Sequence, residues 1–224
     1  MDVLRRSPCA GTANQVAAVV GLLGTLGATA YAQPLVEFKG IAVGSSHEAV
    51  LAAHPWLDCK PVPASLRARL GDQMCDRGRA VDELHACGMR DYQKPMEPQD
   101  ACRASYAAFA SFAGVPLRRS PVLYFRDGAL ASVWVYYPPE SANQVIAALA
   151  EKYGKPSRAD AVALQNRMGA TFEQNVAQWT RRDGTIVARR YGSTIEHGLT
   201  IMFGRDEYRA ASSSADPKKA AKDL

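Results

Sequence analysis

Two Asp-Gly pairs, each flanked by residues that favour β-strands, most restrict the folds open to this chain. Asp127-Gly128 separates "VLYFR" from "ALASVWVYY", and Asp183-Gly184 separates "TFEQNVAQWTRR" from "TIVARRYGS". Asp-Gly favours the tight turn of a β-hairpin, because both residues readily take positive φ. The sequence therefore predicts an antiparallel sheet, to which "GLTIMFG" adds a strand. The register stays open, because two-residue and three-residue turns point different side chains inward.

A helix is predicted at residues 141–153, directly after the first hairpin. Ser141 and Gln144 have the spacing of a capping box, and Gly154 with Pro156 ends the helix. Its apolar residues recur at helical spacing: Ala142, Val145, Ile146, Leu149 and Tyr153. This stripe predicts a helix packed on the sheet.

A similar order occurs near the start of the chain. The run "VEFKGIAVG" is typical of a strand, and a short helix is predicted at residues 46–54, with Ser45 and Glu48 as its capping box. The apolar residues after this box resemble those after Ser141 and Gln144. The sequence thus predicts an α+β fold with helices on one face of an antiparallel sheet, and two weakly repeated units are one reading of it.

The first 32 residues have the features of a signal peptide. Arg5 and Arg6 precede an uncharged stretch whose most apolar part, "VAAVVGLLGTLGATA", is too short to span a bilayer as a helix. Ala30 and Ala32 form an A-x-A cut signal, so we expect cleavage after Ala32. The mature chain would then be periplasmic or secreted, with no stable membrane anchor.

Cleavage also changes the cysteine count, because Cys9 leaves with the leader. The four remaining cysteines are Cys59, Cys75, Cys87 and Cys102. An even number in an oxidising compartment predicts disulfides, and four cysteines allow three pairings. We favour Cys59–Cys75 with Cys87–Cys102, because each bond would enclose a short segment rich in turn residues.

The mature chain is expected to be a single α+β domain over residues 33–204. Residues 59–112 would be a cysteine-bearing insertion with a helical end that places Tyr106, Phe109 and Phe112 on one side. The last segment, 205–224, has few large apolar residues and is predicted to be a flexible charged tail.

The stretch "FKGIAVGSSHEAVLAAHP" resembles the opening of the small outer-membrane-assembly lipoproteins of the SmpA/OmlA (BamE-like) family. The later hairpin, the "KYGKP" helix end and the closing strands resemble the second half of β-lactamase-inhibitor-like folds. This resemblance implies an exported Gram-negative protein with an α+β fold and a binding role without catalysis. The chain departs from the lipoprotein pattern in having no lipobox.

Patterns for metal, cofactor or catalytic chemistry do not stand out. His47 and His54 are seven residues apart, too far for a zincin pair, and the cysteines lack zinc-ligand spacing. His85 and His197 are isolated in the sequence, and no phosphate-binding glycine loop or G-x-S-x-G elbow occurs. We therefore expect no metal, no cofactor and no catalytic residues.

Large aromatic residues and arginines on the predicted strands indicate an interaction surface instead. Neighbouring residues of a strand face opposite sides, so each pair of adjacent arginines gives one side chain to a face. Aromatic residues beside arginines are typical of protein-binding hot spots. The candidate surface consists of Trp134, Tyr136, Arg182 and Arg189.

These features favour a soluble, noncatalytic binding module of the cell envelope, with an assembly accessory, inhibitor or immunity role. Its expected partner is an envelope protein. The leader carries two of the 27 Lys and Arg residues and one of the 22 Asp and Glu residues, so the mature chain keeps a small positive excess. That excess permits an anionic envelope polymer as the partner, and export argues against nucleic acid. The alternative from another class is a periplasmic hydrolase with an unrecognised active site.

Overall fold

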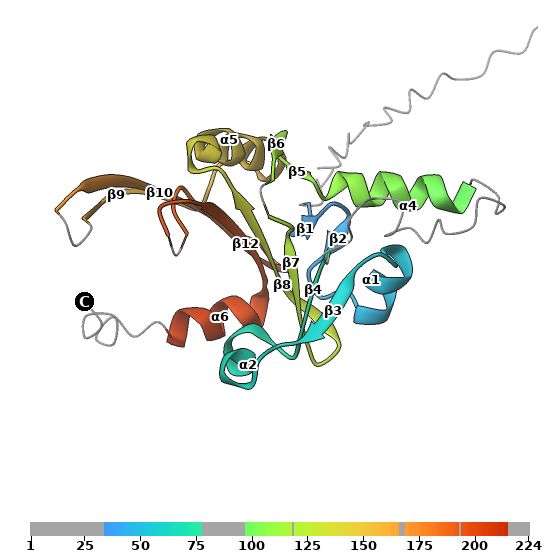
Figure 1. Cartoon of the computed structure of the whole chain (residues 1–224). Coiled ribbons are helices and arrows are strands. Elements are labelled where there is room, and N and C mark those ends of the chain that lie inside the picture. Colours follow the sequence, from blue (N-terminus) through green and yellow to red (C-terminus); the bar gives the residue numbers. More distant parts are fainter. Residues whose placement is uncertain (1–33, 78–96, 118, 166–168, 193, 215–224) are drawn as a thin grey trace, which may run out of the picture. The chain divides into compact units, whose positions relative to one another are not determined.

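The computed structural model describes residues 34–77, 97–117, 119–165, 169–192 and 194–214 (Figure 1). The chain divides between Ala32 and Gln33 into two units, and every described residue belongs to the second. No helix within these ranges is both long enough and apolar enough to cross a membrane.

One eight-stranded sheet organises the described residues, in the order β3-β4-β7-β8-β12-β11-β10-β9, and every neighbouring pair is antiparallel. Its strands are β3 (Asp58–Pro61), β4 (Gln73–Asp76), β7 (Val122–Arg126), β8 (Ala129–Tyr137), β9 (Arg158–Gln165), β10 (Thr171–Thr180), β11 (Gly184–Arg189) and β12 (Gly198–Gly204). Together with the helices around it, this sheet confirms the predicted α+β class.

The first Asp-Gly pair forms the expected hairpin. Arg126 pairs with Ala129, so the turn has two residues, and both Asp127 and Gly128 have positive φ. With this turn and a register shift in the ladder between Tyr124 and Phe125, Val135 and Tyr137 point into the core and Trp134 points to the opposite face. The hairpin register that the sequence left open is thereby fixed.

The second Asp-Gly pair has a different role. Thr180 pairs with Thr185, and the connection between β10 and β11 closes with a bond from the Arg181 N–H to the Gly184 carbonyl, 2.8 Å long. Gly184 lies within β11, where an added Cβ would be 2.1 Å from the Phe203 carbonyl oxygen. The glycine is thus needed for close contact between β11 and β12, and the turn itself precedes it.

Helix α5 (Ala142–Tyr153) follows a short 3-10 turn, η1 (Pro139–Ser141). The face of the sheet that α5 covers is called the first face, and the opposite one the second face. Four residues of the predicted stripe are buried and Ile146 is half-buried. Gly154 ends the helix with φ 78°. The predicted capping box is wrong: Ser141 makes no capping bond, and the Gln144 side chain donates to the Ala113 carbonyl, 3.1 Å away.

The predicted N-terminal strand is instead a small hairpin. β1 (Glu37–Phe38) and β2 (Ile41–Ala42) pair through a turn at Lys39 and Gly40, which both have positive φ. The following helix, α1 (His47–Ala53), matches the predicted range of 46–54. Its cap is Ser46 and not Ser45, because the Ser46 Oγ accepts from the Ala49 N–H at 3.2 Å.

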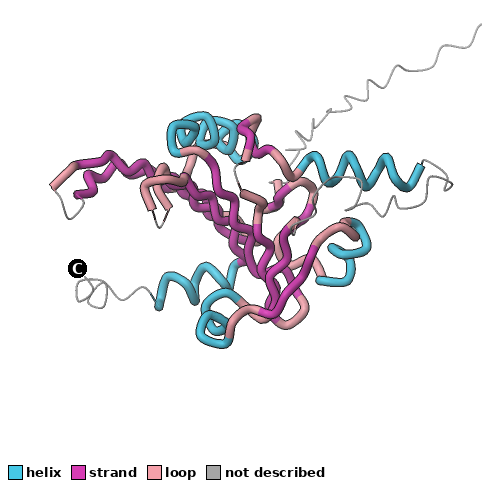
Figure 2. The backbone as a smooth tube through the Cα atoms, viewed as in Figure 1, coloured by secondary structure: helices cyan, strands magenta, loops and turns pink. Residues whose placement is uncertain are grey.

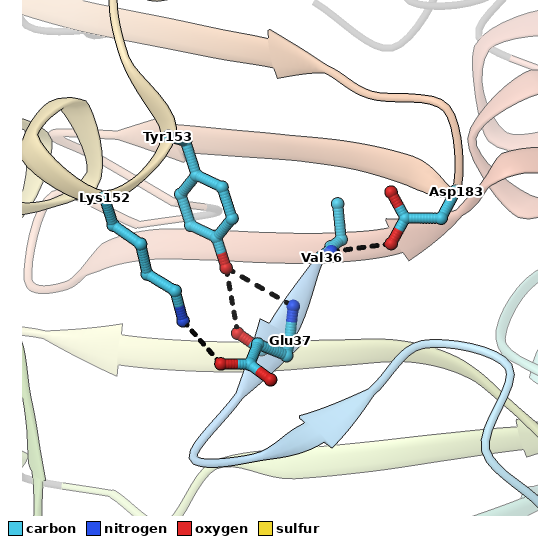
Figure 3. A network of polar contacts seen from close by, with 5 residues as sticks. All are labelled: Val36, Glu37, Lys152, Tyr153 and Asp183. Atoms are coloured by element: carbon cyan, nitrogen blue, oxygen red, sulfur yellow. Dashed lines mark hydrogen bonds and ion pairs between the residues drawn. The ribbon is translucent and has the colours of Figure 1, made fainter. Parts of the chain in front are cut away.

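Four polar contacts fix this hairpin on the first face (Figure 3). The Asp183 carboxylate accepts from the Val36 N–H at 2.6 Å. The Tyr153 hydroxyl lies 3.3 Å from both the backbone nitrogen and the carbonyl oxygen of Glu37, whose carboxylate is 2.8 Å from the Lys152 ammonium. Residues 36 and 37 are thus held to α5 and to the β10–β11 connection.

The cysteine-bearing stretch is only partly an insertion, because β3 and β4 are strands of the main sheet. The Cys59–Cys75 pairing is confirmed and joins these two strands, whose Cα atoms are 4.1 Å apart at the bond. Cys87 lies outside the described residues, and with it the expected Cys87–Cys102 bond. The other elements of the stretch are α2 (Ala64–Leu70), α4 (Glu97–Ala108), β5 (Ser111–Phe112) and β6 (Val115–Pro116). Tyr106, Phe109 and Phe112 are buried, but only Tyr106 belongs to the helix, because α4 ends at Ala108 and Phe112 lies in β5.

Helices lie on both faces of the sheet and not on one alone (Figure 2). α1, α4 and α5 contribute to the larger core, which includes Val50, Tyr106 and Val145. On the second face, Leu70 of α2 packs in a separate cluster, and α6 (Arg205–Ser214) contacts β11 and β12. The predicted flexible tail is therefore wrong for residues 205–214, and residues 215–224 lie outside the described part.

Candidate functional site

A groove of about 510 Å³ lies on the second face, between strands β9–β12 and helix α6. Its strand residues alternate along the chain, as expected for one face of a sheet. The lining consists of Arg158, Asp160, Val162, Gln174, Val176, Gln178, Val187, Arg189 and Phe203 from the strands and Tyr208, Ala211 and Ser212 from α6.

The strand register places these side chains in rows across the sheet. In one row, Arg158 pairs with Gln178, which pairs with Val187. In the next, Asp160 pairs with Val176, which pairs with Arg189. Each row thus contains one valine with a polar side chain beside it. These valines give the groove an apolar floor, and the charged and amide groups lie next to them.

Helix α6 is held against the sheet by its first turns. The Tyr208 hydroxyl donates to the Gln178 side-chain oxygen at 2.9 Å, and the Tyr208 ring lies 5.7 Å from that of Phe203. Glu207 pairs with Arg126 at 2.9 Å. Burial raises the pKa of the Glu207 carboxyl, and the nearby Arg126 opposes this rise. These contacts make α6 a fixed wall of the groove.

The charges in the groove are unequal. Arg158 and Asp160 form an ion pair of 2.5 Å, which leaves the guanidinium of Arg189 as the excess charge among the lining residues. Arg189 is exposed, and guanidinium groups bind carboxylates with two parallel hydrogen bonds. The groove is thus suited to a partly apolar segment that carries a carboxylate.

Tyr137, on the core side of the sheet, fixes the backbone of Arg189. Its hydroxyl donates to the Arg189 carbonyl at 3.0 Å and lies 3.4 Å from the Thr200 hydroxyl. Burial raises the pKa of Tyr137 to about 12.

We expect this buried phenol to make the protein sensitive to alkali. The folded state keeps the proton up to about pH 12 and the unfolded chain only up to about 10, so the stabilisation is complete below pH 10 and is lost as the pH rises towards 12. The wild type should lose about 2–3 kcal/mol more of its unfolding free energy over this interval than Tyr137→Phe. Urea unfolding at a series of pH values measures the difference, and parallel curves for the two proteins would contradict it.

The structure separates the four residues of the predicted surface. Trp134, Tyr136 and Arg189 all lie on the second face, but only Arg189 lines the groove. Trp134 packs on the α2 cluster, with its ring 5.6 Å from that of Tyr124. Tyr136 is half-buried beside the His197 ring, at 6.4 Å. Arg182 lies in the β10–β11 connection, where its carbonyl accepts from the Arg205 side chain.

Sequence reasoning missed the groove residues of β9 and α6. The pattern of "RADAVALQ" was the available signal for β9, since its larger side chains alternate with alanine. For α6, the signal was a pair of acids, Asp206 and Glu207, in the first turn of a stretch that continues with Tyr208 and alanines.

A second, smaller cavity of about 230 Å³ lies on the first face, next to the network of Figure 3. Phe112, Leu149 and Met202 give it an apolar wall, and Lys39 and Lys152 stand at it with Glu37. Lys152 is already paired with Glu37, so the ammonium groups are partly neutralised.

His47 lies close to the Cys59–Cys75 bond. Its Nε2 atom is 3.8 Å from the Cys75 sulfur, and the ligand atoms of all three residues lie within 4.8 Å of one another. Both sulfurs are bonded to each other, however, so the oxidised protein offers only the imidazole as a ligand.

His54 makes a contact that the sequence did not indicate. Its Nδ1 atom is 2.7 Å from the Ser105 hydroxyl, which also accepts from the Trp56 indole at 3.3 Å. Burial lowers the pKa of His54 and so favours the neutral ring. The ring packs against Trp56 and Phe109, at 5.7 and 5.6 Å, which makes the contact a link between α1 and α4 within the aromatic core.

Comparisons with known proteins leave this groove as the main guide to function. No protein-family model, no curated protein and no solved structure matches the chain.

Proposed function

We propose that the chain is an exported, noncatalytic binding module of the cell envelope and that a protein partner binds in the groove between β9–β12 and α6. The observation that carries this proposal is the groove itself, about 510 Å³ in volume, with an apolar floor and an exposed arginine. Binding sites of proteins commonly combine an apolar surface with a few well-placed polar groups.

One further observation supports an exported location. The Cys59–Cys75 disulfide is compatible with an oxidising compartment. We expect cleavage after Ala32. The mature protein would then begin three residues before Val36, which Asp183 holds in place.

We expect Arg189→Ala to weaken partner binding roughly tenfold or more, because arginine is enriched among the few interface residues whose truncation costs about 2 kcal/mol or more. Arg182→Ala is the matched control: it also removes an exposed arginine, but from the β10–β11 connection outside the groove. Capture of envelope proteins by the oxidised mature chain, followed by affinity measurement on the captured partner, compares the two variants.

The possible results separate the proposed groove from its alternatives. Loss of binding with Arg189→Ala alone supports the groove, and undiminished binding by this variant removes it from consideration. Equal, salt-dependent losses with both arginine variants would favour an anionic envelope polymer, which responds to overall charge more than to one position.

A further inference from the structure

Strand β9 leaves one side of its backbone open. Among the described residues, β9 pairs with β10 and with no other strand, over the whole range from Arg158 to Gln165. An edge strand presents a row of unpaired N–H and C=O groups, which can pair with another chain. This end of the sheet therefore offers a ready surface for a further strand.

The usual protection of an edge strand is weak in β9. The strand has no proline, and its two charged residues, Arg158 and Asp160, neutralise each other in an ion pair. Val162 and Leu164 are 48% and 41% exposed. By contrast, β3 at the other edge has only four residues and ends with Pro61. Of the two edge strands, β9 is therefore the better suited to pair with a strand of another chain.

We propose that β9 pairs with β9 of a second copy of this chain, antiparallel and about a two-fold axis at Val162. In this register Val162 lies opposite itself and Ala161 lies opposite Ala163, so seven residues of the strand, 159–165, find a partner. Val162 lies diagonal to Leu164 of the other copy, and such neighbours on a face are within reach of each other, while each Leu164 lies directly opposite Asp160. With a two-fold axis, the same strand of each copy forms the interface.

The neighbouring registers are less favourable. An axis at Ala161 would place Asp160 diagonally across from its own copy, and like charges at such positions repel. An axis at Ala163 would pair only residues 161–165. The register at Val162 alone combines seven paired residues with Val162 directly opposite its own copy and no neighbouring like charges. On the other face, Ala159, Ala161 and Ala163 are small, and Gln165 lies opposite Ala159 of the other copy, so the two strands can meet there without obstruction.

This dimer would also bring the grooves of the two copies next to each other. Because the axis runs through the sheet from face to face, both copies present their second face on the same side. The two grooves, each lined by Arg158, Asp160 and Val162, would lie next to each other. The inference does not depend on the proposed partner, since it concerns the free protein.

The test is the molar mass of the oxidised mature chain, from light scattering over a dilution series. We expect a dimer for the wild type. Val162→Lys and Val162→Glu should each raise the dissociation constant roughly tenfold or more, because each places like charges opposite each other on the axis. An equimolar mixture of the two variants should restore the dimer, since the opposed charges then attract.

Ile195→Lys is the matched control, because Ile195 is also exposed, at 52%, but lies outside the strands of the sheet. It should dimerise as the wild type does. A monomeric wild type at every concentration, or an unchanged dimer with Val162→Lys, would overturn the proposal. Failure of the mixed variants to pair would also overturn it, because a two-fold axis at residue 162 places these side chains directly opposite each other. Circular dichroism of each variant confirms that it is folded.

Discussion

Val145→Asp is expected to lower the free energy of unfolding by about 4 kcal/mol or more, a large share of the total for a domain of this size. Val145 is fully buried between α5 and the sheet, in the core that includes Trp179 and Ile186. A carboxylate at this place would lose its hydration without gaining a partner. Urea unfolding followed by circular dichroism measures the loss.

The two following positions of the same helix are the controls. Ile146 is half-buried and Ala147 is exposed, so Ile146→Asp should cost less than Val145→Asp and Ala147→Asp should cost about 0.5 kcal/mol or less. Burial raises the pKa of the introduced carboxyl at position 145 above the unfolded value of about 3.9, so its penalty should shrink as the pH falls towards that value. Equal losses at the three positions would show that the helix face is wrongly assigned.

Local sequence chemistry was sufficient where the backbone itself sets the geometry. Asp127 and Gly128 both take positive φ in a two-residue turn, and Gly154 ends α5 in the same region. The apolar stripe of α5 follows from helical spacing, and four of its five residues are buried. Such features depend on neighbours in the sequence, which a single chain displays directly.

Elements that depend on distant neighbours could not be recognised in this way. β9 is rich in alanine, which has low β-propensity, and it forms because β10 pairs with it along its length. α6 has a mostly polar sequence, and Tyr208 and Glu207 hold it through contacts with Gln178 and Arg126. The bonds that define both elements link residues that the sequence alone does not connect.

The candidate site was predictable to the same extent. The surface predicted from strand alternation contained Trp134, Tyr136, Arg182 and Arg189, with the register left open; the structure places three of them on one face and Arg182 in the β10–β11 connection. Which of them is accessible depends on α2 and α6, which cover different parts of that face. A pattern of alternation identifies a face, but only the packing of the helices divides it into a covered region and a groove.

Loss of the Cys59–Cys75 bond is expected to have the second largest effect. The bond closes a segment with a sequence separation of 16, for which the entropy of the unfolded chain predicts a stabilisation of about 3 kcal/mol. It joins β3 to β4, and β3 has no other neighbour in the described sheet. Cys75 is fully buried in the larger core, so the bond also attaches this edge to the rest of the molecule.

The double variant Cys59→Ala/Cys75→Ala tests this effect without leaving an unpaired thiol from the bond. Under oxidising conditions, its free energy of unfolding in urea should be lower than that of the wild type by about 3 kcal/mol. With a dithiol reductant present, the difference between the two proteins should nearly vanish, because the wild type then lacks the same bond. A difference that survives reduction would mean that the sulfur atoms stabilise the core by packing, beside His47 and Leu123, and not by linking the two strands. Equal stability of the two oxidised proteins would show that pairing with β4 alone keeps β3 in the sheet.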